Sequence, residues 1–380
     1  MTMTLRHAAG SLLVVGLSGT ELTGLERAWL RLVRPGGVIL FRRNIANGRQ
    51  TRDLLQEATE LCSTHSFRCV DVEGGTVDRL RDALAPMPSA QAVARAAEKR
   101  GNLTLARRHG ELIGRAVRAF GFNTTLAPVL DLALPESASV MGTRAAACDA
   151  EGVVRYARAM LAGLQSHGVA GCGKHFPGLG AGTLDSHVET PQIHRSWNEL
   201  WEADLKPYRV LRHELPMVMV NHAAYPMTAG KARPASVSAF WMTTVLRKRI
   251  GYAGLIFSDD LEMGGILKYM SIEEASVEAV RAGIDTMEIC HSPELILRGY
   301  EALLHEGEKS AVFRKMLLQR AQSVGRKRAK MFKTGSGAAM SEKQLAALRE
   351  RILRFGDEVR QLADSSTSAE PKMGKHVEAT

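Results

Sequence analysis

The sequence predicts a (β/α)8 barrel, and three observations carry that prediction. Eight short apolar runs, most of them rich in β-branched residues, recur along the 380-residue chain. The runs are continuous rather than alternating and are bounded by glycine or proline, which is typical of parallel strands buried on both faces. Segments of helical period separate most of the runs. A doubly wound open sheet is the alternative, but no Gly-x-Gly-x-x-Gly motif follows the first run.

The elements follow one another in a regular order. The expected strands span residues 11–17, 37–41, 67–73, 122–131, 169–176, 216–222, 253–260 and 284–290. The expected helices span residues 49–62, 91–119, 150–167, 196–213, 238–249, 271–282 and 293–304. A Lys/Arg-rich helical region, 307–333, follows the eighth strand, and a further helix is expected over 341–362, where Ser341 and Gln344 have the spacing of a capping box.

These elements divide the chain into three parts. We expect a single catalytic TIM-type barrel domain over 1–335 and a C-terminal helical extension over 336–364. The last segment, 365–380, is rich in Ser, Thr, Pro and Lys without periodicity, so we expect it to be disordered.

The distribution of charge restricts the possible partners. The formal net charge is +10, but the residues from 311 to the end hold 15 lysines and arginines against 7 acidic residues. Most of the excess therefore lies in the last fifth of the chain, where a solvated helix is favoured over a contact with RNA or lipid. Aromatic residues make up only 5% of the chain, which argues against stacked base-binding platforms. We expect neither a nucleic-acid nor a membrane partner.

Cysteine usage and hydropathy predict the compartment. Five cysteines are scattered without a CxxC motif, which favours reduced thiols over a disulfide framework or a zinc site. A signal peptide is the alternative explanation for Arg6 and the apolar run after it, but the run is short and no A-x-A-like cleavage site follows. No run approaches the roughly 18 residues of a membrane span. We expect a cytoplasmic protein that is a monomer or a weak homo-oligomer.

Polar residues end at least five of the expected strands, at the face where a barrel of this kind carries its active site. The strand-end groups are Asp71–Gly75, Asp131, Lys174–Gly178, Asn221–His222 and Ser258–Asp260. Some strand-end residues cap the next helix, and that is the alternative for Asp131 and Asp260. Asp259, Lys174 and His175 are costly to bury without a purpose, which favours a function for them.

The loop after the fifth strand carries the strongest local signal. Its glycines, Gly178, Gly180 and Gly182, indicate a mobile segment that can bring a catalytic group to a pocket. Asp185 and His187 lie two residues apart, so a turn can place the carboxylate on an imidazole nitrogen and stabilise the imidazolium. The alternative is an Asx-turn in a surface loop with an incidental histidine.

Taken together, these motifs resemble glycoside hydrolase family 3, and within it the NagZ-type β-N-acetylglucosaminidases. The principal motifs are Lys174–Gly178, Asp185–His187 and, about 70 residues later, Phe257–Met263. The further matching pieces are Gly37–Phe41, Asp71–Gly75, Leu126–Asp131, Arg233–Ser236 and Gly254–Phe257. The resemblance covers roughly residues 11–330, and the motifs are specific as a set.

The resemblance implies a retaining, two-step exo-hydrolysis without a metal or other cofactor. Asp259 would be the nucleophile, and His187, held by Asp185, would act as general acid and then as general base. A histidine suits both proton transfers because its unperturbed pKa is about 6.5. The small carbohydrate substrate would be N-acetylglucosamine β-linked to an anhydro-N-acetylmuramyl (peptide) product of cell-wall recycling, that is, a muropeptide. The residues implied to bind its terminal sugar are Asp71, Arg79, Arg144, Lys174, His175 and His222.

Three departures from the family pattern concern loop conformation and preference beyond the first sugar. Leu179 replaces a common second histidine, Thr76 a basic residue, and Val72 a frequent glutamine. Glu288 is also unexpected among the apolar residues of the eighth strand; it either faces the barrel interior or simply ends the strand.

Other functions remain open at this point. A β-glucosidase, or a phosphorylase that uses phosphate as acceptor, is a near alternative, although family glucosidases usually take a glutamate acid from an added domain. A metal-dependent barrel hydrolase would use His175, His187, His222 and Asp259, but the first strand lacks the His-x-His of amidohydrolase barrels. A non-catalytic sugar-binding protein is more remote, because Asp259 and His187 are both present.

Overall fold

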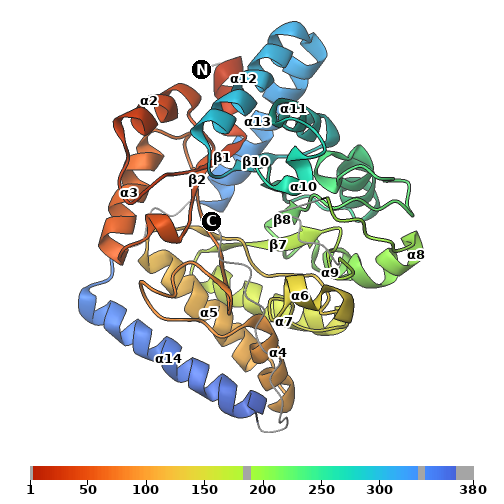
Figure 1. The fold of residues 1–380 in the computed structure, drawn as a ribbon. Coiled ribbons are helices and arrows are strands. Elements are labelled where there is room, and N and C mark those ends of the chain that lie inside the picture. Colours follow the sequence, from red (N-terminus) through yellow and green to blue (C-terminus); the bar gives the residue numbers. More distant parts are fainter. Residues whose placement is uncertain (1–2, 183–189, 333–338, 365–380) are drawn as a thin grey trace.

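The computed structural model describes residues 3–182, 190–332 and 339–364 (Figure 1). Parallel strands close into a barrel in the order β1-β10-β9-β8-β7-β6-β3-β2, which confirms the predicted fold class. The barrel strands are β1 (Leu13–Gly16), β2 (Gly37–Leu40), β3 (Phe67–Val70), β6 (Thr124–Thr125), β7 (Ala170–Phe176), β8 (Met217–Val220), β9 (Leu255–Asp260) and β10 (Thr286–Ile289). A separate antiparallel hairpin pairs β4 (Val72–Gly74) with β5 (Val77–Asp78) directly after β3.

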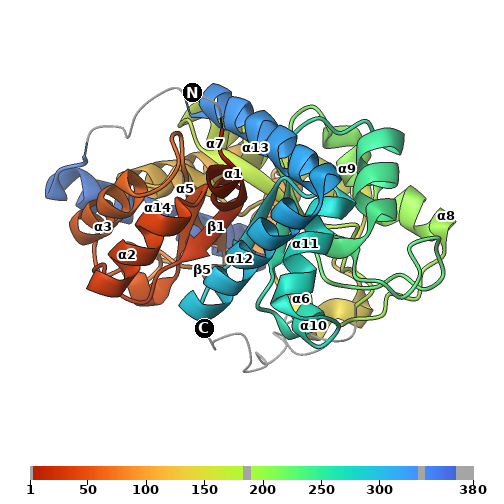
Figure 2. The ribbon, with the colours of Figure 1, turned by 90° about the horizontal axis from the view of Figure 1, so that it is seen from above.

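Helices surround the barrel, as Figures 1 and 2 show. The first half holds α1 (Leu5–Ser11), α2 (Gly24–Val33), α3 (Gly48–Glu60), α4 (Ala90–Lys99), α5 (Thr104–Ala119), α6 (Ala138–Met141) and α7 (Ala150–Ser166). The second half holds α8 (Trp197–Glu199), α9 (Lys206–Leu211), α10 (Gly264–Leu267), α11 (Ile272–Ala282), α12 (Pro293–Lys309), α13 (Ala311–Met331) and α14 (Glu342–Asp364). Short 3₁₀ turns are η1 (Arg42–Asn44), η2 (Pro135–Ser137) and η4 (Ala235–Val237), and π-helical segments are η3 (Leu200–Asp204) and η5 (Phe240–Arg249).

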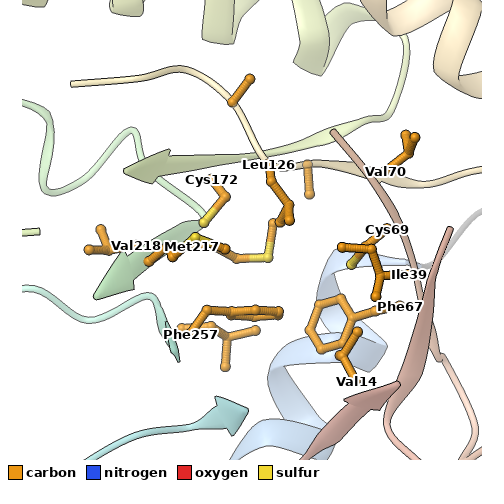
Figure 3. Close-up of a cluster of buried hydrophobic side chains, with 14 of the residues drawn as sticks. Val14, Ile39, Phe67, Cys69, Val70, Leu126, Cys172, Met217, Val218 and Phe257 are labelled. Atoms are coloured by element: carbon orange, nitrogen blue, oxygen red, sulfur yellow. The ribbon is translucent and has the colours of Figure 1, made fainter. Parts of the chain in front are cut away.

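Side chains fill the barrel, so its interior is a packed core rather than a pore. Figure 3 shows Phe67 and Phe257 lying together inside it, with Cys69 and Cys172 nearby. The two rings meet edge to face with centroids 4.9 Å apart. Side chains alternate along a strand, so the inward direction of these residues fixes which later residues also point inward.

The helices α5 and α7 pack closely because each presents a glycine to the other. A Cβ on Gly110 would lie 2.1 Å from the carbonyl oxygen of Met160, and one on Gly163 would lie 2.3 Å from that of Arg107. No side chain fits at either contact. This close packing fixes the helices that precede β6 and β7, and those strands lead into the functional side chains.

The structure differs from the sequence-based elements at several places. The run 11–17 is not all strand, since α1 extends to Ser11 and β1 begins at Leu13. The expected helix 91–119 is divided into α4 and α5, with Gly101 at φ +71° in the turn between them. The expected strand 122–131 contains only the short β6, because the peptide then leaves the regular ladder near Pro128, which has no N–H to donate.

The expected C-terminal helix is present as α14, and it packs against α4 and α5. Figure 1 shows it well separated from α13. Its apolar face is fully buried through Leu348, Ile352, Phe355 and Val359. Glu358 bridges Arg100 and Arg108 at 2.5 and 2.6 Å. The break at 334–337 and the segment 365–380 lie outside the described residues.

Among the described residues, no helix combines the length and the apolar character that a bilayer crossing requires.

Candidate active site

Three buried charged residues and the partly buried Arg144 form a network at the carboxyl ends of β3 and β7. The Lys174 Nζ atom lies 2.8 Å from Asp71 Oδ1 and 2.6 Å from Glu73 Oε1. Arg144 donates two hydrogen bonds of 2.8 Å to the two carboxylate oxygens of Glu73. This paired geometry is specific to the planar guanidinium group. The network links β7, the hairpin after β3 and the loop before α7.

The charges of this network stabilise one another. Burial alone would raise the pKa of Glu73, but Arg144 and Lys174 outweigh it and hold that pKa well below its ordinary value. Burial alone would lower the pKa of Lys174, but Asp71 and Glu73 raise it above its ordinary value. Glu73 and Lys174 therefore stay ionised near neutrality, which gives the site a fixed hydrogen-bond donor beside an anionic acceptor.

The hairpin geometry allows Glu73 to reach this position. Gly74 follows it with φ +94°, a conformation that side chains with a Cβ rarely adopt. A Cβ on Gly74 would also lie 2.2 Å from the carbonyl oxygen of Pro88. Only glycine therefore suits the turn that places Glu73 between Lys174 and Arg144.

His175 is held in one orientation from two sides. Its Nδ1 lies 2.7 Å from Asp131 Oδ2, so Nδ1 carries the proton and Nε2 is left as an acceptor, 3.3 Å from Arg144 Nη2. The other oxygen of Asp131 accepts a 2.7 Å hydrogen bond from the backbone of Leu179. Asp131 thus anchors His175 and the start of the following loop, and the structure shows it in this role rather than as a helix cap.

Asp259 lies on the inward face of β9. Phe257 points into the barrel (Figure 3). The register with β10 shifts between Phe257 and Asp260, and beyond this shift the charge of Asp259 acts on Cys172, whose side chain also lies inside the barrel. Asp259 Oδ1 accepts a 3.0 Å hydrogen bond from the backbone of Asp260. Asp260 has different contacts, since its Oδ2 lies 3.3 Å from His291 Nε2 and its Oδ1 accepts from the backbone of Glu262.

His222 is buried, and both of its ring nitrogens contact protein groups. Nε2 lies 2.9 Å from the carbonyl oxygen of Asp260, and Nδ1 lies 2.7 Å from Ser236 Oγ. Because a carbonyl oxygen only accepts, Nε2 is the donor and Nδ1 accepts from the serine hydroxyl. His222 therefore supports the end of β9 that carries the aspartate pair.

Arg79 lies beside Asp71 and follows the hairpin. Its backbone donates a 3.0 Å hydrogen bond to the carbonyl oxygen of Asp71, and its guanidinium carbon lies 5.6 Å from the centroid of the Phe41 ring. Its Nε is buried and has no hydrogen-bond partner within the described residues. A donor in this state is available to a polar ligand.

Asp185 and His187 lie outside the described residues, but both ends of their segment are described. Before it, Tyr225 donates a 2.7 Å hydrogen bond to the carbonyl oxygen of Gly178. After it, the Thr190 hydroxyl donates a 2.6 Å hydrogen bond to the carbonyl oxygen of Gly265. Gly265 follows β9 by a few residues, so the chain beyond the segment lies next to the loop after Asp259.

A family comparison decides the class of the protein. The model of the glycosyl hydrolase family 3 N-terminal domain matches residues 4–324. The chain belongs to glycoside hydrolase family 3. It is therefore a hydrolase of glycosidic bonds on a TIM-type barrel, and the resemblance seen in its motifs is confirmed.

The family 3 relatives narrow this class. The chain is 36% identical over 285 residues to a β-hexosaminidase of Nitrosomonas eutropha, covering 74% of this chain and 81% of the relative. A β-N-acetylglucosaminidase structure from Paenibacillus has 30% identity and a TM-score of 0.82, covering 93% of this chain and 69% of that one. NagZ from Neisseria gonorrhoeae, in complex with N-trifluoroacetyl-D-glucosamine, has 30% identity and a TM-score of 0.75. The match covers 93% of this chain and 98% of the NagZ chain. Within family 3 the chain is thus similar to enzymes named as β-hexosaminidases and NagZ-type β-N-acetylglucosaminidases.

The metal-dependent alternative gains no support from the geometry of this family 3 site. In the described parts of the chain, no three His, Cys, Asp or Glu side chains gather in a way that could hold a metal ion. His175 and His222, which that alternative needs, direct their ring nitrogens at Asp131, Arg144, Ser236 and the Asp260 backbone.

The sequence predicted most of these side chains as site residues, but it did not predict Glu73, which lies at the centre of the network. Glu73 received no role, although it is the shared partner of Lys174 and Arg144. A signal was present, because a glutamate followed by two glycines at a strand end combines a charge with an unusual turn. His291 was missed as well; it comes directly after the eighth strand and contacts Asp260.

Glu73→Gln should destabilise the fold strongly, since removing one member of a buried ion pair typically costs about 3–5 kcal/mol. Because the pKa of Glu73 is lowered in the folded protein, its carboxylate stabilises the fold fully above the unfolded pKa of 4.5. This stabilisation is lost progressively as the pH falls below 4.5. Urea unfolding should therefore show a large difference from wild type at pH 7 that shrinks in acid.

The exposed ion pair of Glu294 with Arg298 provides a matched control. Glu294→Gln should leave the unfolding free energy nearly unchanged at both pH values. A Glu73→Gln protein as stable as wild type at pH 7 would contradict the assigned network.

Proposed function

We propose that this enzyme removes terminal β-linked N-acetylglucosamine from the non-reducing end of its substrate with retention of configuration, and that Asp259 is the nucleophile. The observation that carries the proposal is the position of Asp259 on the inward face of β9, at the barrel end where the network of Asp71, Lys174, Glu73 and Arg144 lies. In a retaining glycosidase one carboxylate attacks the anomeric carbon and forms a covalent intermediate.

In the first step, the Asp259 carboxylate attacks the anomeric carbon while His187 protonates the departing glycosidic oxygen. This leaves a glycosyl-enzyme ester and a free aglycone. In the second step, His187 removes a proton from water, which attacks the same carbon and restores the Asp259 carboxylate. Asp185 would orient His187 and stabilise its imidazolium. The anchoring of Thr190 beside the loop after β9 supports this arrangement.

The charged network would hold the sugar. Lys174 contacts Oδ1 of Asp71, which leaves Oδ2 to accept hydrogen bonds from sugar hydroxyls. Arg79, with its buried unpartnered Nε, and Arg144 and Lys174 would supply donors. His175 Nε2 would add an acceptor beside these donors. Burial of the non-reducing terminal sugar among these groups would make the enzyme exo-acting.

Several neighbours would position the nucleophile rather than contact the sugar. The Asp260 backbone donates to Asp259, and His222 holds the Asp260 carbonyl oxygen. His291 and the Glu262 backbone fix the Asp260 carboxylate. We therefore assign His222 and Asp260 to support of β9, which refines the binding role first expected for His222.

We further propose that the natural substrate is the N-acetylglucosaminyl anhydromuramyl (peptide) fragment of cell-wall recycling and that the enzyme acts in the cytoplasm. The N-acetylglucosamine analogue bound by the similar NagZ structure supports the first sugar. All five cysteines are free thiols, which suits a reducing compartment.

A panel of p-nitrophenyl β-glycosides tests the proposed specificity. We expect kcat/KM for the 2-acetamido sugar to exceed that for the glucoside by about 100-fold or more, because a site built around a polar substituent rejects the analogue that lacks it. Assays in phosphate and in phosphate-free buffer should give equal rates and free N-acetylglucosamine.

Two results of this panel would redirect the proposal. Comparable rates on the glucoside would assign the chain to a broader β-glycosidase. A sugar 1-phosphate as the main product in phosphate buffer would make it a phosphorylase.

A further inference from the structure

Glu288 is an ionisable residue on the inward face of a barrel strand. It lies in β10 and is 2% exposed. The next residue, Ile289, faces the helix layer, because its Cδ1 lies 2.9 Å from the position of a Cβ on Gly299 in α12. Alternation along the strand then turns Glu288 toward the barrel interior.

The height of Glu288 in the barrel places it at the level of the proposed nucleophile. Its Cα pairs with that of Asp260 on β9 and with that of Val14 on β1. Below this level lie Phe67 and Phe257, which Figure 3 shows inside the barrel. Thr286, two residues before Glu288, pairs with Phe257 one layer lower. Glu288 therefore forms part of the floor beneath the carboxyl ends of the strands.

The carboxyl group of Glu288 is not satisfied by its surroundings. Its Oε1 is buried and has no hydrogen-bond partner among the described residues. A buried polar atom without a partner costs folding free energy, and a leucine of similar size at this position would avoid that cost. Such unfavourable groups are retained where they serve a function.

Charged and titratable groups face Glu288 from the elements around it. Asp259 and Asp260 come from β9, Asp71 follows β3, and Lys174 comes from β7. The thiols of Cys69 on β3, Cys172 on β7 and Cys290 after β10 also interact with its charge. The neighbouring strand β1, Leu13–Gly16, pairs with β10 and holds no titratable residue.

These surroundings determine the protonation state of Glu288. Burial, followed by Asp71, Asp259 and Asp260, raises the pKa of Glu288 well above its ordinary value, and Lys174 offsets this only in part. These surroundings favour the protonated form of Glu288 far more than water does. A protonated carboxyl group is a hydrogen-bond donor, and it adds no further negative charge to the three aspartates.

We propose that Glu288 is a positioning residue of the hydrolytic site: a neutral carboxylic acid on the barrel floor whose O–H group supports the carboxylate of Asp259. This inference rests on the proposed role of Asp259 as nucleophile. A donor from the floor orients the attacking carboxylate and stabilises its anionic form. It does so without contacting the sugar.

Replacement by residues with and without a donor tests this role. Glu288→Gln keeps size and an N–H donor, and it should stay within a few-fold of wild-type kcat. Glu288→Leu removes the donor, and it should lower kcat on p-nitrophenyl N-acetylglucosaminide by about 10- to 100-fold, the typical effect of a hydrogen bond to a charged group. KM should change little. The Leu variant should melt at the same or a higher temperature than wild type.

The pH profile provides a readout that a structural role would not move. Loss of a donor to a carboxylate raises its pKa. The acid limb of kcat/KM should therefore move to higher pH in Glu288→Leu and stay in place in Glu288→Gln. Glu288→Met repeats the test with a more flexible apolar chain if the Leu variant does not fold.

Thr286→Val is a matched control, because the Thr286 hydroxyl is also buried without a partner but lies one layer lower. It should keep wild-type kinetics and an unchanged acid limb. Wild-type kcat and pH profile in both apolar Glu288 variants would overturn the inference. Equal losses of activity in the Gln and Leu variants, with lowered melting temperatures, would also overturn it and assign Glu288 a structural role.

Asp259→Asn separates this inference from the proposed function. If that variant is inactive while Glu288→Leu behaves as wild type, the role of Glu288 fails and the nucleophile stands. If Asp259→Asn retains turnover, the proposed function itself fails.

Discussion

Asp259→Ala should abolish turnover, with a loss of about 10⁴-fold or more, while the protein keeps its fold. The substitution removes the group that attacks the anomeric carbon, and no neighbouring carboxylate can replace it. Asp260 is tied to His291 and the Glu262 backbone, and Asp71 is tied to Lys174. Initial rates on p-nitrophenyl N-acetylglucosaminide, together with circular dichroism and melting temperature, measure both parts of this expectation.

Asp260→Ala is the matched control for this prediction. It lies next to Asp259 but supports the end of β9, so we expect a smaller loss of activity. Near-wild-type hydrolysis by purified Asp259→Ala, or a larger effect at Asp260, would assign the nucleophile elsewhere.

His187→Ala should affect substrates according to their leaving group. General acid catalysis typically contributes about 10² to 10⁴-fold in rate, and a sugar leaving group needs the proton whereas a nitrophenolate needs little. Cleavage of a disaccharide should therefore fall far more than formation of the glycosyl-enzyme from the aryl glycoside. With the aryl substrate, hydrolysis of the intermediate should become rate-limiting because it lacks its base.

Rescue of the His187→Ala variant by azide is the decisive measurement. A small anionic nucleophile needs no general base, so it should restore aryl turnover and give a β-glycosyl azide. Asp185→Ala should show a milder form of the same pattern, because that residue orients the imidazole without transferring the proton. Equal losses on both kinds of substrate, with no rescue by azide, would mean that another residue carries the proton.

The barrel could be predicted because its strands are short, apolar and repeated, and each of the eight expected runs contains a barrel strand. The elements that were missed have local causes. α1 received no prediction because only its last residue, Ser11, lies in the apolar run 11–17 that predicted the first strand. α2 received no helix prediction, although Thr23 and Glu26 form a capping box at its start.

The catalytic face could be predicted in outline because parallel strands end together. Their polar ends therefore meet, as Asp71 and Lys174 do. Pairings that depend on distant segments could not be predicted. Arg144 contacts Glu73 across 71 residues of sequence, and His175 contacts Asp131 across 44. Nothing local to Glu73 identifies which cations it serves, and the inward direction of Glu288 depends on the packing of β10 against α12.

The central claim is the covalent intermediate on Asp259, and trapping it is the most direct test. His187→Ala enzyme should be mixed with p-nitrophenyl N-acetylglucosaminide, quenched in acid, digested and sequenced by mass spectrometry. We expect an N-acetylglucosaminyl ester on the Asp259 carboxylate that disappears when azide is added before the quench. An ester on another residue, or release of an oxazoline formed by the substrate's own acetamido group with no modified peptide, would contradict it.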